Sequence, residues 1–354
     1  DISKESLDGV KGEIARIGGK DHYSRFQVEG WWHTDYALSN RTGLMVVAPT
    51  GAGKTEVFLL PLVASIAKSL KEQPSKAPRY VLVYPRVALL KDQLSRVFKY
   101  SFYASNEYFS GQRTLLGNKS HNHENPIVIG LQYGGISSER STTFQDRNIF
   151  DQERFLTVPN CPICETGQLI KRKAKENIVP LKCDNDVCQA AFHVTLGRND
   201  LEKVKPHILV TTIESLDRLY LNPKIETYLK NLDALVFDEV HLYYSLYGAH
   251  VSNIIRRVEK IQEHGKPLAK IASSATVSNP ERFAAKLFYG DENNQVYLHD
   301  ANDKVYPSES GGLEVIFFLR SPEGEDFPPP QATLLQVAMA MGHSVLGTED
   351  RTIL

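Results

Sequence analysis

Short runs of β-branched and aliphatic residues recur along the chain, with more polar segments between them. The runs cover residues 44–47, 80–84, 127–131, 207–210, 234–237 and 270–272. Continuous apolar runs of this length are typical of parallel strands that are buried on both faces of a sheet. Residues 56–70 and 88–98 carry apolar side chains at the spacing of amphipathic helices. The alternation predicts an α/β fold with a doubly wound parallel sheet.

Two stretches interrupt this alternation. Residues 133–205 hold a polar segment and then a cysteine cluster, which predicts an insertion at an edge of the sheet. After Tyr289 the sequence is rich in Asp, Asn, Ser, Gly and Pro, which predicts a linker that leaves the first domain. The predicted organisation is the first part of domain 1 in residues 1–132, the insertion in 133–205, the second part of domain 1 in 206–290, and the linker with the start of domain 2 in 291–354.

Length and composition leave room for two compact domains. The chain has 354 residues, of which 42% are hydrophobic. Its 41 Lys and Arg residues nearly balance 42 Asp and Glu residues, and the formal net charge is −1. Total charge therefore gives no indication of nucleic-acid binding, which would have to be local.

The sequence predicts neither a membrane partner nor secretion. The apolar runs end well before the roughly 18 residues that a membrane helix needs. Residues 1–11 are polar and acidic, where a signal peptide has a basic start and an apolar stretch. We therefore expect a soluble, cytoplasmic protein. Because position 1 is Asp and not Met, we also expect the native N-terminus to be missing.

Residues 48–55, APTGAGKT, lie between a predicted strand and a predicted helix, which is the context of a phosphate-binding loop. Gly51 and Gly53 let the backbone N–H groups converge on a phosphate, and the helix N-terminus adds positive potential. Lys54, on a solvent-facing loop, would reach the β- and γ-phosphates, and the Thr55 hydroxyl would ligate Mg²⁺. The alternative is a plain glycine turn with a solvated Lys. The predicted ATP-binding residues are Thr50, Gly51, Ala52, Gly53, Lys54 and Thr55.

Residues 234–241, ALVFDEVH, set two carboxylates at the C-terminal end of a predicted strand. An α/β sheet binds its ligand at that edge. Asp238 would hold Mg²⁺ directly or through water, and Glu239 would polarise the attacking water. An Asp-Glu pair can also be a helix N-cap, but the phosphate-binding loop favours a catalytic role. The predicted catalytic residues are Lys54, Asp238, Glu239 and His241.

The two motifs resemble those of the superfamily-two DExH helicases, and the resemblance runs through most of the chain. Ala48, where the general phosphate-loop pattern begins with Gly, is the form seen in helicases. The resemblance implies a RecA-like first domain and an ATP-dependent helicase or translocase motor. It also implies nucleic acid as the partner, with DNA favoured and with 3′ to 5′ polarity.

The resemblance also implies roles for residues outside the two motifs. The family's first DNA-contacting motif is matched by Tyr84, Pro85 and Arg86 with Leu89 and Gln93, and its second by Thr211, Thr212 and Ser215. The motif that couples hydrolysis to domain movement is matched by Ser274, Ala275 and Thr276. Gln27, which follows Phe26, lies upstream of the phosphate-binding loop, where the family has a Gln that reads adenine.

A narrower resemblance is to the YprA-like branch, which includes repair helicases and the large helicases of DISARM and related phage-defence systems. Residues 238–261 and 271–287 carry it, with Gly248, His250, Arg256 and Arg257, and then residues 273–280, as its signature. The alternative for residues 254–258 is an amphipathic helix with an exposed basic face. In this family a second RecA-like domain supplies arginine fingers to the ATP site, and residues 351–354 resemble its first strand. The resemblance thus also allows other subunits of a defence or repair complex as partners.

All four cysteines fall in one cluster with paired spacings. Two residues separate Cys161 from Cys164, and four separate Cys183 from Cys188. Two such knuckles suit tetrahedral Zn²⁺ in a structural zinc ribbon, although an iron-sulfur cluster stays an alternative. His193 is expected to be a plain surface residue. The basic residues Lys171, Arg172, Lys173, Lys175 and Lys182 would either follow a phosphate backbone or form a solvated face.

Two rival functions remain open on the sequence. One is a translocase that moves on duplex DNA without separating its strands. The other is a zinc-ribbon scaffold that binds DNA and uses its nucleotide as a switch. DNA-stimulated ATP turnover with strand separation would support the helicase, and turnover without separation would support the translocase. Nucleotide-dependent DNA binding without turnover would support the scaffold. The choice between repair and phage defence is also open.

Overall fold

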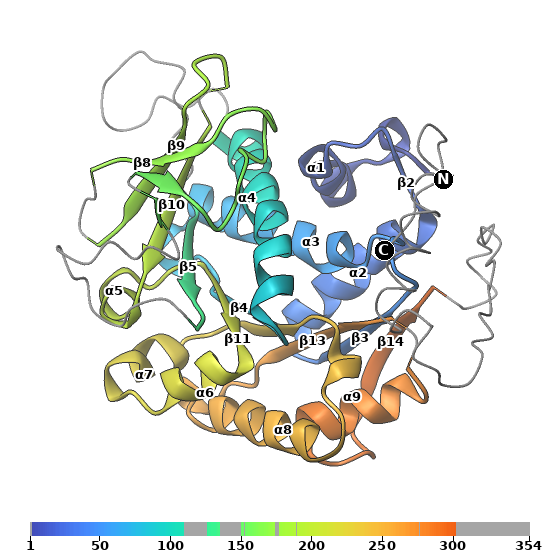
Figure 1. Cartoon of the computed structure of the whole chain (residues 1–354). Coiled ribbons are helices and arrows are strands. Elements are labelled where there is room, and N and C mark those ends of the chain that lie inside the picture. The colour runs from blue at the N-terminus through green and yellow to red at the C-terminus, as the bar shows by residue number, and fades with distance from the viewer. Residues whose placement is uncertain are drawn as a thin grey trace, which may run out of the picture. The chain divides into compact units, whose positions relative to one another are not determined.

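A computed structural model of the chain places its apolar runs in one 12-stranded sheet (Figure 1). It describes residues 2–109, 126–134, 150–151, 153–173, 177–188, 190–275 and 277–301. The strand order is β14-β3-β13-β12-β4-β11-β5-β10-β9-β8-β7-β6. The six predicted strands are confirmed as β3 (Gly43–Val47), β4 (Tyr80–Tyr84), β5 (Val128–Gln132), β11 (Ile208–Thr212), β12 (Ala234–Phe237) and β13 (Ala269–Ser274).

These six strands are all parallel, so their carboxyl ends share one edge of the sheet. Val83 of β4 is paired with Phe237 of β12, and Ala272 of β13 is paired with Phe237 on its other side. β13 in turn pairs with β3, with Ser274 opposite Val47. The phosphate-binding loop and the acidic residues therefore leave the sheet at the same edge, as the strand-end motifs predict.

Helices cover both faces of the sheet, which confirms the doubly wound arrangement. The predicted helices are α3 (Lys54–Glu72) and α4 (Val87–Phe109), and they pack on one face with α1 (Gly9–Gly18) and α2 (Arg25–Asn40). The other face carries α6 (Ile213–Tyr220), α7 (Pro223–Leu229), α8 (Ser245–Lys260) and α9 (Pro280–Tyr289). Alternate residues of β3 serve the two cores: Leu44 and Val46 face the first, and Met45 and Val47 face the second.

Short elements complete the described part of the chain. β1 (Ile2–Ser3) and β2 (His22–Tyr23) form a separate antiparallel pair. The 3-10 turns are η1 (Lys4–Ser6), η2 (Pro74–Lys76), η3 (Val240–Leu242) and η4 (Glu263–Gly265). None of the helices in this part of the chain combines the length and apolarity needed to span a bilayer.

The predicted insertion continues the main sheet. Its last strand, β10 (Ala191–Leu196), is parallel to β5, with His193 opposite Val128. An antiparallel series then extends outward through β9 (Val179–Cys183), β8 (Leu169–Lys171), β7 (Arg154–Phe155) and β6 (Phe150–Asp151). The helix α5 (Arg198–Val204) leads from β10 back to β11.

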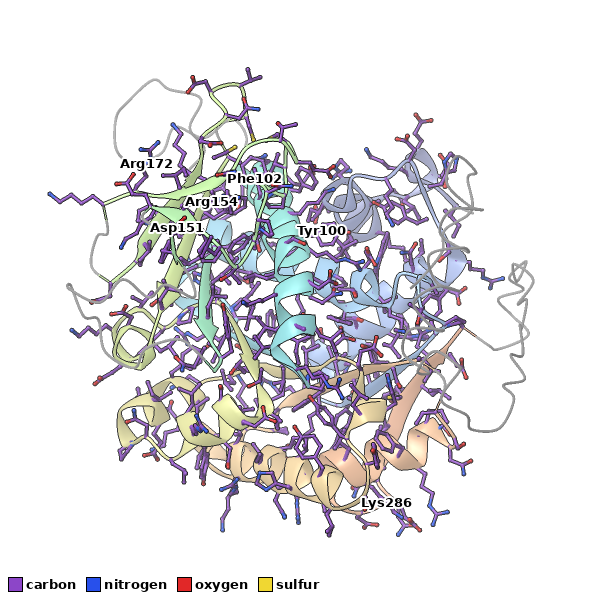
Figure 2. All side chains as sticks on the ribbon, viewed as in Figure 1. Tyr100, Phe102, Asp151, Arg154, Arg172 and Lys286 are labelled. Atoms are coloured by element: carbon purple, nitrogen blue, oxygen red, sulfur yellow. The ribbon has the colours of Figure 1, made fainter. Side chains whose placement is uncertain are left out.

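Aromatic packing fixes the insertion to α4. The rings of Phe192 on β10 and Phe98 on α4 stack with centroids 4.9 Å apart. Phe102, one turn further along α4, lies 6.0 Å from Phe192 on the side of α4 that faces the insertion (Figure 2). The insertion therefore shares its hydrophobic core with the main domain.

The range predicted as a linker contains one more strand of the sheet. β14 (Val296–Asp300) pairs in parallel with β3, with Tyr297 opposite Leu44. The compact unit that contains this sheet runs to Pro307. β14 therefore belongs to the sheet although it follows Gly290, and the domain bounds stay a prediction. The predicted start of a second domain lies outside the described residues, as does Thr276.

Candidate functional site

The phosphate-binding loop has the backbone that its glycines predict. Gly51 and Gly53 have φ angles of 85° and 82°, in the left-handed region where side chains are disfavoured. Gly53 is the N-cap of α3, so the loop delivers backbone N–H groups to a helix N-terminus. This combination is a ready-made site for an anion.

Lys54 lies inside the site and not on a solvent-facing loop, which corrects the prediction. It is the first residue of α3 and only 7% exposed. Its Nζ donates a hydrogen bond to the Ala48 carbonyl oxygen at 3.0 Å and lies 3.9 Å from Glu239 Oε1. The ammonium therefore bridges the phosphate-binding loop and the acidic pair, which follow the parallel strands β3 and β12 at one edge of the sheet, with β13 between these strands.

Asp238 is a buried carboxylate at the end of β12. It is 6% exposed, and the Ser273 hydroxyl of β13 donates a hydrogen bond to its Oδ1. Burial raises the pKa of the Asp238 carboxyl, while the hydrogen bond from Ser273 lowers it. A divalent cation would stabilise the ionised form in such a site, so the carboxylate suits the predicted Mg²⁺ ligand.

Glu239 and His241 connect the acidic pair to β13. Glu239 has a φ angle of 50°, a left-handed conformation that is uncommon for this residue type. His241 Nδ1 lies 3.2 Å from Glu239 Oε2. The same nitrogen lies 3.2 Å from the Ser274 hydroxyl oxygen. His241 thus links the predicted water-polarising residue to the predicted coupling motif.

Two glutamines approach the phosphate-binding loop. The Thr55 hydroxyl lies 3.3 Å from Gln93 Oε1, so a residue of the predicted DNA-contacting motif reaches the predicted Mg²⁺ ligand. Gln27 accepts a hydrogen bond from the Ser24 backbone N–H at 3.2 Å, in the capping box of α2. A Cβ added at Gly53 would lie 2.2 Å from Gln27 Nε2. Gln27 therefore packs on the loop, and its reading of adenine stays a prediction.

The predicted nucleic-acid contacts meet at the ends of β4 and β11. Thr212 is paired with Tyr84, the residue that precedes Pro85 and Arg86. Arg86 is exposed, whereas Thr211 is fully buried and its hydroxyl donates to the Gln132 carbonyl oxygen at 2.6 Å. The geometry thus leaves Arg86 as a group that can reach a phosphate, while Thr211 supports the backbone at this edge.

The contact of Ser273 with Asp238 was not predicted from the sequence, where Ser273 is only part of the signature of the YprA-like branch. Ser273 lies 35 positions from Asp238 in the chain, and its hydroxyl meets that carboxylate only because β12 and β13 are neighbours. A Ser two positions before an Ala in an SSAT sequence carries no local signal for this contact.

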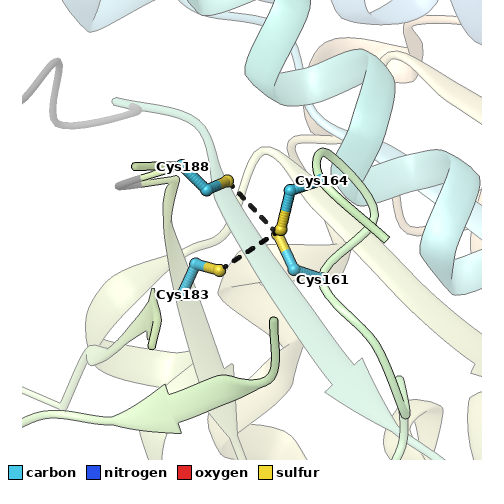
Figure 3. A group of neighbouring side chains, drawn as sticks. All are labelled: Cys161, Cys164, Cys183 and Cys188. Carbon is cyan, nitrogen blue, oxygen red and sulfur yellow. Dashed lines mark hydrogen bonds between the residues drawn. The ribbon is translucent and has the colours of Figure 1, made fainter. Parts of the chain in front are cut away.

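The four cysteine side chains converge, as their spacing predicts (Figure 3). All four sulfur atoms lie within 4.8 Å of one another. The Sγ atoms of Cys161 and Cys188 are 3.8 Å apart, and those of Cys164 and Cys183 are 3.7 Å apart. Sulfur atoms bound to one zinc at about 2.3 Å in a tetrahedron are separated by similar distances.

Backbone donors around the cysteines favour thiolates. The Gly167 N–H donates to Cys164 Sγ at 3.3 Å, and the Asn185 N–H donates to Cys183 Sγ at 3.4 Å. Such bonds stabilise the negative sulfur, which is the form that binds metal. The cluster therefore fits a closed four-thiolate metal site, which would join the segment before β8 to the end of β9 and its connection to β10, and leave no open position for a substrate.

Replacing Cys161 and Cys164 together with Ser is expected to remove the metal. Elemental analysis should find about one zinc per unmodified chain and none in the variant, because two remaining thiolates do not complete a tetrahedral site. His193→Ala is the matched control and should retain the zinc, since four cysteines already supply every ligand. An unmodified protein without zinc would contradict the assignment, and iron in its place would favour the iron-sulfur alternative.

With this geometry in place, comparisons with known proteins define the family. The chain belongs to the DEAD/DEAH box helicase family, whose profile it matches over residues 34–142 and 163–283. This confirms the resemblance to superfamily-two helicases. Relatives include the "Druantia protein DruE" of Escherichia coli (strain UMEA 4076-1), which is 24% identical over 306 residues, covering 72% of this chain and 16% of DruE.

The YprA-like resemblance also has support. The "Uncharacterized ATP-dependent helicase YprA" of Bacillus subtilis (strain 168) is 34% identical over 84 residues, covering 23% of this chain and 11% of YprA. Among solved structures, "DUF1998 helicase MrfA" aligns with a TM-score of 0.55 at 20% identity, over 99% of this chain and 38% of MrfA. The MrfA structure and this chain share the RecA-like helicase fold. The chain spans only a small part of the relatives that it matches.

Proposed function

We propose that this chain is the first RecA-like half of an ATP-dependent helicase or translocase motor that acts on DNA. The observation that carries the proposal is the bridge from Lys54 to Glu239, at 3.9 Å between Nζ and Oε1. It brings the phosphate-binding loop and the acidic pair to one buried locus, which is the arrangement that phosphoryl transfer requires.

In the proposed mechanism, the backbone N–H groups of residues 50–55 and the Lys54 ammonium hold the ATP phosphates. Thr55 and Asp238 would hold Mg²⁺, which supplies charge neutralisation at the β- and γ-phosphates. Glu239 orients and polarises the attacking water, and His241 fixes the position of Glu239. His241 and Ser274 would couple ATP hydrolysis at this site to the movement of the domains. An arginine from a second RecA-like domain would stabilise the transition state.

DNA is the favoured partner for several reasons. The MrfA helicase, which has the same fold, has been solved as "MrfA bound to DNA and AMPPNP". That structure aligns with this chain with a TM-score of 0.51. In this chain, the exposed Arg86 lies at the carboxyl edge, where the paired strands β4 and β11 end. The exposed Arg172 and Lys173 on the insertion offer a second basic surface for a phosphate backbone. The resemblance to the YprA-like branch favours repair or phage defence, in a complex with other subunits.

A steady-state assay of the intact protein tests the proposal. ATP hydrolysis should rise on addition of single-stranded DNA, and a duplex with a 3′ single-stranded tail should be unwound faster than one with a 5′ tail. Single-stranded RNA serves as the matched comparison for DNA. Stimulated turnover without unwinding would favour the duplex translocase. ATP-dependent DNA binding without turnover would favour the scaffold and contradict the proposed motor.

A further inference from the structure

A row of polar contacts joins α6 to α8, which lie side by side in Figure 1. The Tyr247 hydroxyl donates a hydrogen bond to Glu214 Oε1 at 2.7 Å. One turn along α6, Asp217 forms an ion pair with Arg257 through Oδ1, and its Oδ2 lies 3.8 Å from His250 Nε2. Residues three or four apart share a helix face, so each helix turns one face to the other. The carboxylates come from α6, and their partners come from α8.

Each helix begins at a different part of the proposed site. α6 starts directly after Thr212, whose hydroxyl donates to Ser215 Oγ in the first turn at 3.3 Å. α8 starts at Ser245, after the η3 turn that follows Glu239. The contacts between α6 and α8 therefore join the proposed nucleic-acid edge to the segment that carries the proposed water-polarising residue.

A chain of packed rings leads from the same contacts to the acidic pair. The Tyr247 ring lies 5.7 Å from that of Tyr243, centroid to centroid, and the Tyr243 ring lies 6.4 Å from that of Phe237. Tyr243 is 1% exposed and Phe237 is fully buried. Phe237 is bonded to Asp238. Because Tyr243 and Phe237 lie in the close-packed interior, a shift of the Tyr243 ring would displace the Phe237 ring.

These contacts are poorly placed to stabilise the fold. The side chains of Asp217 and Arg257 are 25% and 37% exposed, and Tyr247 is 37% exposed. Partly exposed ion pairs contribute little to the free energy of unfolding. Stability therefore does not explain these contacts. Their position between α6 and α8, which begin at two parts of the proposed site, suggests a functional role.

We propose that Glu214 and Asp217 are positioning residues that couple nucleic-acid contact at the β11 edge to the placement of Asp238 and Glu239. The inference rests on the proposed motor function. Nucleic acid that draws the start of α6 into a new position would move α8 through Tyr247 and Arg257, and the DEVH segment would follow. Among the described residues, the partners of both carboxylates are side chains of α8 and not the phosphate-binding loop, Asp238 or Glu239, so the carboxylates should act on the stimulated rate and leave the basal rate unchanged.

The test compares variants of the intact protein in ATP hydrolysis with and without saturating single-stranded DNA. Tyr247→Phe combined with Asp217→Asn removes the hydroxyl and the charge at nearly constant volume. It should lower the DNA-stimulated kcat about tenfold, within the usual range of coupling between sites, without changing the DNA-free kcat. The Kd for DNA from fluorescence anisotropy and the Tm should stay at native values. The charge exchange Asp217→Arg with Arg257→Asp should restore most of the stimulation that Asp217→Arg alone removes.

Glu226→Gln is the matched control. It breaks a comparably exposed ion pair with Lys230, at 2.8 Å, on α7. Three results would each overturn the inference and leave the proposed function standing. They are full stimulation in the Tyr247 and Asp217 double variant, an equal loss of stimulation in the control, and a charge exchange that restores no stimulation. An intact protein whose hydrolysis does not respond to single-stranded DNA would overturn the proposed function, and this inference with it.

Discussion

Lys54→Ala is expected to lower the kcat for ATP hydrolysis by about 10²- to 10³-fold, the loss typical when a preorganised donor to developing charge is removed. The Lys54 ammonium is buried and held 3.0 Å from the Ala48 carbonyl oxygen, so its position is set before ATP binds. Loss of this group leaves the γ-phosphate charge without its closest proposed cation. A steady-state hydrolysis assay of the intact protein measures the effect.

The control for this variant is Lys68→Ala. Lys68 is on the same helix, α3, but exposed, so its removal changes the total charge equally without touching the loop. It should retain native turnover, and both variants should keep a native far-UV circular dichroism spectrum. Native turnover in Lys54→Ala would remove the phosphate-binding role from this loop.

Glu239→Gln should separate nucleotide binding from hydrolysis. The substitution keeps the size of the side chain but removes the carboxylate that polarises water, for which a loss of about 10²- to 10⁴-fold in kcat is typical. Lys54, Thr55 and Asp238 are unchanged, so the affinity for ATP with Mg²⁺ should stay close to native. Titration with a fluorescent ATP analogue, together with the hydrolysis assay, distinguishes the two effects.

Glu226→Gln again provides the comparison, because it makes the same chemical change at an exposed site on α7. It should leave both binding and hydrolysis unchanged. A Glu239→Gln protein that binds ATP weakly would indicate that Glu239 holds the nucleotide or the metal, and the role proposed for the carboxylate would be wrong.

Local signals carry the parts of the fold that could be predicted. The runs that became β3, β4 and β12 are continuous and fully buried, so their apolar pattern is unambiguous. β14 is as long as β3 and β4, but it contains His299 and Asp300, and only one of its residues is buried. Its place beside β3 follows from pairing across more than 240 positions in sequence, as between Val296 and Gly43. No nearby residue indicates such a pairing.

In the site, too, local motifs could be predicted and contacts between distant residues could not. The phosphate-binding loop and the DEVH segment are contiguous motifs, so their residues could be named from the sequence. The buried position of Lys54 could not, because it depends on the Ala48 carbonyl oxygen and on Glu239 arriving from another strand. The α6 to α8 contacts likewise join residues 33 to 40 positions apart, such as Glu214 with Tyr247 and Asp217 with Arg257.

The pairing of β10 with β5 has a mechanical consequence. Backbone hydrogen bonds run without a break from β3, which ends at the phosphate-binding loop, to β9, which ends at Cys183. A hinge needs a segment that can change its dihedral angles freely, and a hydrogen-bonded ladder with stacked Phe192 and Phe98 offers none at that junction. The described strands of the insertion should therefore move together with the rest of the sheet, and not about a hinge between β10 and β5. During the ATP cycle, any ligand bound to the insertion would then move together with the edge of the sheet that carries the proposed catalytic residues.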